Sequence, residues 1–124
     1  MIEAFKNFLS SKGITPTCSE NLVQFRYKDL NFALVNQDSD PYYFSLILPN
    51  IYEFTQAEDL KIRETMDDMT RRYKVAKYYI RNENVWLAAE QFVYSRDNIN
   101  ALFDRLLGLL EEAYNDFNKK IRES

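Results

Sequence analysis

The chain has 124 residues, of which 46% are hydrophobic and 28% charged, as expected of one globular domain with one core. Its formal net charge of -3 argues against a nucleic-acid or anionic-membrane site, because either would need an excess of clustered Lys and Arg. No leader is evident and no apolar run approaches the roughly 20 residues that a bilayer needs, so we expect a single cytoplasmic domain over residues 1–124.

Apolar residues at helical spacing begin the chain. The positions concerned are Ile2, Phe5, Phe8 and Leu9. Gly13 follows them and can adopt the left-handed conformation at which many helices stop. We therefore expect a short first helix that ends near Gly13 and a loop after it.

A β-hairpin is expected next. Residues 22–27 and 30–35 are two β-prone runs separated by Lys28-Asp29, and a two-residue turn there fixes the register. The expected pairs are Tyr27 with Leu30, Phe25 with Phe32, and Val23 with Leu34. These six side chains then share an apolar face, and the opposite face is mostly polar.

The run YYFSLIL at residues 42–48 is apolar or aromatic on both faces of an expected third strand. Residues 38–41 are typical of a turn, and Pro49-Asn50 is expected to end the strand. We assign Phe44, Leu46 and Leu48 to the core and Tyr43 and Ile47 to the second face. The turn does not fix the orientation of the strand, so the reverse assignment stays open.

A second helix is expected to start near Thr55, because Glu58 stands three residues later, as in a capping box. Its apolar stripe consists of Leu60, Met66, Met69 and Tyr73. Charged residues occupy the opposite side, which is typical of an amphipathic surface helix.

Residues 74–81 and 85–94 predict a second hairpin, joined around residues 82–84. The favoured pairs are Arg81 with Trp86, Tyr79 with Ala88, Lys77 with Glu90, and Val75 with Phe92. This register places a cation beside the indole and opposite charges beside each other, whereas a slide by one residue would place Glu90 on the apolar side. The expected core residues are Ala76, Tyr78, Ile80, Leu87 and Ala89.

A long amphipathic helix is expected to end the chain. Ser95 or Asp97 can cap it, and apolar residues at helical spacing continue from Ile99 to Ile121. Gly108 either permits a close approach to the sheet or is merely tolerated. The element order is then α-β-β-β-α-β-β-α, which predicts an α+β fold with a five-stranded antiparallel sheet.

This order resembles that of the YbjN family of proposed bacterial sensory-transduction regulators. The resemblance rests on RRYKVAKYYIRNENVWLAAEQFV, followed by SRDNINALFDRLLGLLEEAY, and extends over essentially the whole chain. It implies a fold like that of type III secretion chaperones, with the N- and C-terminal helices on one face of a curved sheet, and often a homodimer. Lys28-Asp29 stands where the family pattern would have a glycine turn.

The residue types disfavour an enzyme, a metal site or a cofactor site. There is no histidine, the single cysteine is Cys18, and two glycines cannot form a phosphate-binding loop. Adjacent carboxylates such as Glu111-Glu112 point about 100° apart on a helix, so they do not converge on a substrate. Asp38, Asp40 and Glu53 lack the spacing of a calcium loop. We therefore assign no catalytic, metal or cofactor residue.

A binding surface is the stronger hypothesis. In the expected registers, the sheet face away from the terminal helices carries aromatic and aliphatic side chains that need a cover. The candidate partner-binding residues are Val35, Tyr43, Ile47, Tyr79, Arg81 and Trp86, with Met66 and Met69 of the second helix. That helix, a second copy of the chain or a client polypeptide can provide the cover.

The sequence therefore favours a non-enzymatic protein-binding module, chaperone-like or regulatory, that engages a partner or its own dimer mate through the open sheet face or the second helix. The alternative is a regulatory domain that binds a small apolar ligand between helix and sheet.

Overall fold

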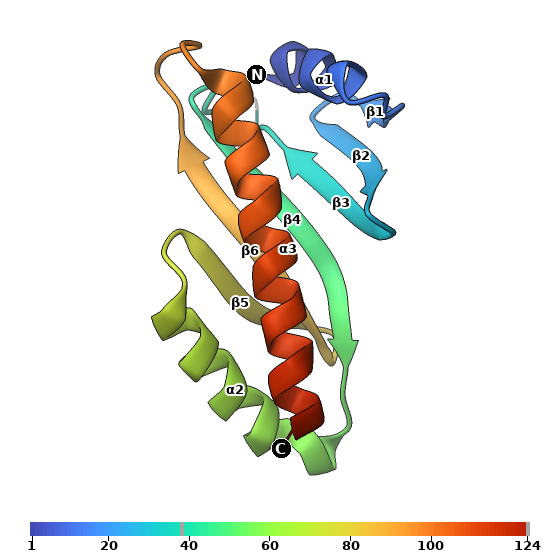
Figure 1. Ribbon diagram of the computed structural model, residues 1–124, viewed down its shortest axis with the longest axis vertical. Coiled ribbons are helices and arrows are strands. Elements are labelled where there is room, and N and C mark those ends of the chain that lie inside the picture. The colour runs from blue at the N-terminus through green and yellow to red at the C-terminus, as the bar shows by residue number, and fades with distance from the viewer. Residues whose placement is uncertain (38, 124) are drawn as a thin grey trace.

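The computed structural model describes residues 1–37 and 39–123, which form an α+β fold with three α-helices and a six-stranded antiparallel sheet (Figure 1). The elements are α1 (Ile2–Ser11), β1 (Thr17–Ser19), β2 (Leu22–Tyr27), β3 (Leu30–Val35), β4 (Tyr43–Glu53), the 3-10 turn η1 (Gln56–Glu58), α2 (Asp59–Arg72), β5 (Ala76–Arg81), β6 (Asn84–Phe92) and α3 (Ile99–Glu123). The strand order is β1-β2-β3-β4-β6-β5. Asp38, part of the expected turn, lies outside the described residues.

The prediction of five strands was wrong, because the chain forms an additional edge strand, β1. Thr17 pairs with Gln24 and Ser19 pairs with Leu22, so β1 lies antiparallel to β2. All three residues of β1 are exposed. A strand without a buried face has no apolar alternation, which is the main strand signal in a sequence.

The first hairpin has the predicted register. Tyr27 pairs with Leu30 and Phe25 pairs with Phe32. Lys28 and Asp29 have φ values of 49° and 63°, so both turn residues adopt the left-handed conformation that a type I′ turn requires. The turn therefore forms without the glycine that the family pattern would have.

The strand β4 continues beyond Pro49-Asn50, where it was expected to end. The register shifts between Leu48, which pairs with Leu87, and Tyr52, which pairs with Val85. Proline is tolerated at such a bulge because the pairing is already interrupted there. The predicted orientation of the strand is confirmed: Phe44, Leu46 and Leu48 are buried.

The second hairpin is shifted by two residues from the predicted register. Tyr79 pairs with Trp86 rather than with Ala88, because Asn82 and Glu83, with φ values of 53° and 63°, form a two-residue turn. A shift of two residues keeps every side chain on its predicted face. Of the predicted core residues, Ala76, Tyr78, Leu87 and Ala89 are buried and Ile80 is half-buried.

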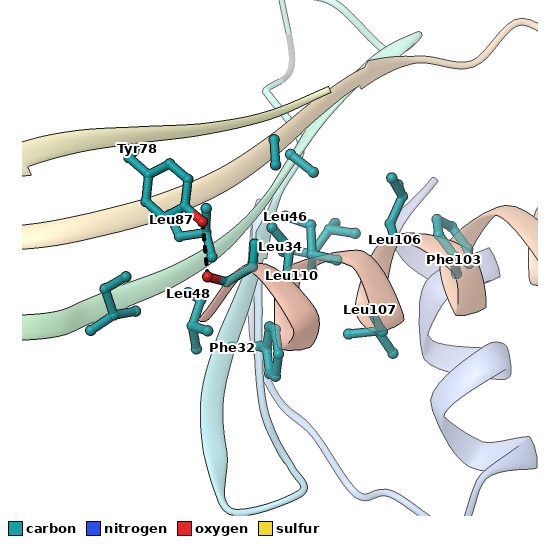
Figure 2. Packing of buried hydrophobic residues seen from close by; sticks show 14 of the residues in the cluster. Phe32, Leu34, Leu46, Leu48, Tyr78, Leu87, Phe103, Leu106, Leu107 and Leu110 are labelled. Carbon is teal, nitrogen blue, oxygen red and sulfur yellow. Dashed lines mark hydrogen bonds between the residues drawn. The ribbon is translucent and has the colours of Figure 1, made fainter. Parts of the chain in front are cut away.

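The core lies between the sheet and α3. Figure 2 shows leucine side chains of the sheet directed toward α3, and the hydroxyl of Tyr78 donates a hydrogen bond of 2.8 Å to the carbonyl of Ala113. Phe103 of α3 has ring-centroid distances of 4.7 Å to Phe5 and 5.7 Å to Phe44. The helix α1 therefore joins the core near the N-terminal end of α3.

The helix α2 lies beside the C-terminal half of α3 (Figure 1), where the Tyr73 hydroxyl donates a hydrogen bond to Asp116. The predicted capping box is confirmed at the start of η1. The Thr55 side chain accepts a hydrogen bond from the backbone N–H of Glu58, and the Glu58 side chain accepts one from the backbone N–H of Thr55.

Met69 of the predicted stripe is fully buried, but Leu60 is 70% exposed and Ile62, which was placed off the stripe, is fully buried. The predicted stripe was therefore wrong at its start, because the buried side of α2 runs through Ile62 instead of Leu60.

Replacing Gly108 by alanine is expected to raise the free energy of unfolding by about 1 kcal/mol, because alanine has the higher helix propensity. A Cβ atom at Gly108 would meet nothing within 4 Å, so the glycine is tolerated rather than needed for close packing. Gly13 is the matched control: its φ of 75° makes alanine there strained and destabilising. Urea denaturation of both variants measures the effect, and a loss of stability in Gly108→Ala would contradict this account.

Candidate partner-binding face

The side of the sheet that the helices leave uncovered, here called the open face, carries six of the eight predicted partner-binding residues. Register pairing places them on one side: Tyr79 lies opposite Trp86, and Ile47 lies opposite Ala88. Val35, Tyr43, Ile47, Tyr79 and Trp86 are half-buried, and Arg81 is exposed. Aliphatic and aromatic side chains therefore remain partly accessible on this face.

The two methionines lie elsewhere. Met69 is fully buried in the core, and Met66 packs against the same cluster. The helix α2 therefore does not cover the open face, and its exposed apolar side chain, Leu60 at 70%, lies outside that face. Of the three covers that the sequence left open, α2 acting through Leu60, Met66 and Met69 was wrong, because this helix packs against α3 and β5 instead.

A polar network holds Tyr43 on the open face. Its hydroxyl donates a hydrogen bond to Glu90, and Lys77 forms an ion pair with the same carboxylate. Burial and the hydrogen bond to Glu90 raise the pKa of Tyr43 to about 12. Hydrogen bonds from Lys77 and then from Tyr43 hold the pKa of Glu90 below its usual value. The ion pair predicted from the sequence thus exists, although Lys77 pairs with Ala88 in the strand ladder.

Replacing Glu90 by glutamine is expected to lower the free energy of unfolding at pH 7 by roughly 0.2–1 kcal/mol, since the pair is partly exposed. The folded pKa of Glu90 is lowered, so the stabilisation is fully present above the unfolded pKa and is lost as the pH falls through the folded pKa. Urea denaturation at pH 7 and near pH 3 checks this. An equal difference between variant and wild type at both pH values would contradict it.

A second group of open-face residues surrounds the single tryptophan. The rings of Tyr79 and Trp86 lie 6.0 Å apart, and the guanidinium of Arg81 lies 5.1 Å from the indole. The indole nitrogen donates a hydrogen bond of 3.0 Å to the side chain of Asn50. The bulge in β4 thus supplies the residue that orients the indole.

Sequence reasoning missed an aromatic cluster beside Tyr43, where β4 begins and β6 ends. The ring centroids of Tyr43 and Phe92 lie 5.2 Å apart, and those of Tyr42 and Tyr94 lie 5.1 Å apart. Phe92 also stacks on Tyr94 at 6.2 Å. Tyr42, Phe92 and Tyr94 are 51%, 54% and 76% exposed, which is unusual for large rings gathered in one place.

The wrong register concealed this cluster. It placed Phe92 opposite Val75, inside the β5–β6 ladder, whereas Ala76 is the first residue of β5 and pairs with Ala89. Phe92 instead pairs with Tyr43 across β4 and β6. The available signal was the alternation of Phe92 and Tyr94 beyond the apolar core of the strand.

The described residues contain neither a metal-binding cluster nor a membrane-spanning helix. Across residues 1–37 and 39–123, no group of three or more acidic or cysteine side chains is placed to hold a metal ion. Within the same described residues, no helix has both the length and the apolar character to span a bilayer.

Comparison with known proteins tests the fold. No protein-family model and no curated protein matches the chain. The crystal structure of YbjN, a proposed transcription regulator from E. coli, superposes with a TM-score of 0.73 over 97% of this chain and 93% of YbjN. The chain has the fold of YbjN. The expected resemblance to YbjN is therefore confirmed for the fold, at a sequence identity of 8%.

Proposed function

We propose that the protein is a non-enzymatic binding module that holds a polypeptide against its open face. The observation that carries the proposal is the cluster of Tyr42, Tyr43, Phe92 and Tyr94, three of whose rings are more than half exposed. Exposed apolar patches of this kind mark interaction sites. The polypeptide is either a partner protein or a second copy of the chain.

The composition of the face supports a polypeptide ligand. Aromatic residues and arginine are the side chains most often found at binding hot spots, and the face combines the aromatic cluster with Trp86 and Arg81. Lys77 and Glu90 add charged groups beside Tyr43. This arrangement matches the general pattern of an apolar centre with a polar rim.

A regulatory or chaperone-like role follows from the same proposal. YbjN is a proposed transcription regulator, and a regulatory role for this chain would act through the polypeptide that its open face holds. A chaperone-like module would hold an extended client segment along the strands of the open face, where Tyr43, Tyr79 and Trp86 are side-chain anchors. The partner is then expected to bind stoichiometrically.

Substitution within the aromatic cluster tests the proposal. Phe92→Ser combined with Tyr94→Ser removes two exposed rings, whereas Leu60→Ser removes an exposed apolar side chain away from the open face. The double variant is expected to lose self-association or partner binding, and the control is expected to keep it. Sedimentation equilibrium measures the first, and titration of a co-purified partner measures the second.

The second candidate function is a regulatory domain for a small ligand bound between helix and sheet. A groove on the helix side of the molecule favours it. This groove is separate from the open face.

A further inference from the structure

A groove of about 440 Å³ lies between α3 and the connection from α2 to β5. It lies where β5 begins at Ala76, opposite Ala89, so that among the described residues no strand pairs with the end of β6 on the side away from β4. Gln91 of β6 lines the groove at this point. Its volume falls within the range of small-molecule sites, roughly 300–1,000 Å³.

One wall of the groove is an apolar stripe of α3. Leu102, Leu106 and Leu109 line it and lie three or four residues apart, so they stand on one side of the helix. Leu106 is almost fully buried, while Leu102 and Leu109 are half-buried. An apolar chain placed here would complete the burial of two leucines.

The opposite wall contains a residue in a strained conformation. Val75 lines the groove, is 51% exposed, and has a φ of 73°. A β-branched residue is a conformational outlier in this region, where its Cβ crowds the backbone. Such outliers concentrate at ligand sites, and an exposed valine gains nothing from the core that would offset its strain. The valine side chain is therefore held in the wall of the groove at a conformational cost.

The rim of the groove is predominantly cationic. Arg72, Lys74 and Arg105 line it, against the single carboxylate of Glu112. Arg72 is paired with Asp68 at 3.4 Å, whereas Lys74 and Arg105 form no ion pair with any other described residue. In a protein with a net charge of -3, two unpaired cations beside an apolar groove favour an anionic group at its edge.

We propose that this groove binds an amphipathic monocarboxylate, of the class of a medium-chain fatty acid. The carboxylate contacts Lys74 and Arg105, and the alkyl chain lies between Val75 and the leucine stripe of α3. This site lies on the helix side of the sheet and does not depend on the proposed function of the open face. A ligand bound there contacts α3 and residues 73–75, which connect α2 to β5.

Calorimetric titration with decanoate, kept below its micelle-forming concentration, tests the proposal. We expect saturable binding of one decanoate per chain, weakened at least about tenfold in a Lys74→Gln/Arg105→Gln variant, because two charge-assisted contacts are lost. Arg71→Gln is the matched control, since Arg71 lies on α2, pairs with Asp67 and does not line the groove. Decanol, which has the same alkyl chain without the charge, is expected to bind more weakly than decanoate.

Three results would overturn the proposal: no decanoate binding up to about 1 mM, equal affinity of the double variant and the wild type, or decanol binding as tightly as decanoate. The Phe92→Ser/Tyr94→Ser variant should bind decanoate normally, so failure of the open-face proposal and failure of the groove proposal are distinguishable.

Val75→Gly provides an independent readout. Glycine adopts a positive φ without strain but lacks the side chain that walls the groove. The variant is therefore expected to melt at a higher temperature than the wild type and to bind decanoate more weakly. A variant with unchanged decanoate affinity would show that Val75 is not part of the site.

Discussion

The Phe92→Ser/Tyr94→Ser variant is expected to weaken binding at the open face by at least about a hundredfold, since truncation of one hot-spot side chain costs about 2 kcal/mol or more and the variant removes two rings. Phe92 and Tyr94 are 54% and 76% exposed, so their removal should leave the core unchanged. The rings contact Tyr42 and Tyr43, and their loss opens the whole cluster to water. The quantity measured is the dissociation constant of the homodimer or of the partner complex.

The Leu60→Ser control separates this effect from a general loss of surface hydrophobicity. Leu60 is 70% exposed and lies on α2, away from the open face. Unchanged binding by the double variant, or an equal loss of binding in the Leu60→Ser control, would show that the aromatic cluster is not the binding site. Circular dichroism should show that all three proteins keep the same fold.

Phe103→Ala is expected to lower the free energy of unfolding by about 3–5 kcal/mol, the usual cost of removing a buried aromatic ring. Phe103 is fully buried and contacts Phe5 and Phe8 of α1 and Phe44 of β4. It therefore joins three elements that are distant in sequence. Small domains have a total stability of only about 5–15 kcal/mol, so the variant should be close to unfolding.

Urea denaturation measures this loss, with Phe92→Ala as the matched control for removing a ring. Because Phe92 is half exposed, its truncation is expected to cost less than about 1.5 kcal/mol. Similar losses in the two variants would contradict the placement of Phe103 at the centre of the core.

Local rules predicted much of the fold because they act within a few residues. The turn at Lys28-Asp29 connects two strands directly, so turn length alone fixed the register of the first hairpin. The alternation in residues 43–48 similarly predicted which side chains of β4 are buried. Side chains alternate between the two faces of a strand, so the face of every residue is fixed once the register of one turn is known.

The second hairpin shows where side-chain chemistry is insufficient. Arg81 still lies over Trp86, and Lys77 still pairs with Glu90, although neither pair is directly opposite in the ladder. Long side chains reach diagonal neighbours, so two registers satisfied the same contacts. The two-residue turn at Asn82 and Glu83, both with positive φ, selects the observed register. A glycine there would have predicted such a turn from the sequence, whereas Asn82-Glu83 did not.

The candidate site was predicted in part. Tyr43, Tyr79 and Trp86 share the open face because face assignment survives a shift of two residues. Phe92 and Tyr94 were missed because their position depends on β4 and β6 pairing across a long separation in sequence. Met69 was assigned to a binding surface because a helical stripe does not reveal which layer it contacts.

Acrylamide quenching of tryptophan fluorescence tests the central claim most directly, because Trp86 is the single tryptophan and lies half-buried on the open face. If the open face binds a polypeptide, acrylamide quenching of Trp86 should fall as the homodimer or the partner complex forms. In the Phe92→Ser/Tyr94→Ser variant, quenching of Trp86 should stay unchanged under the same conditions. A complex that forms with no change in the quenching of Trp86 would contradict the claim.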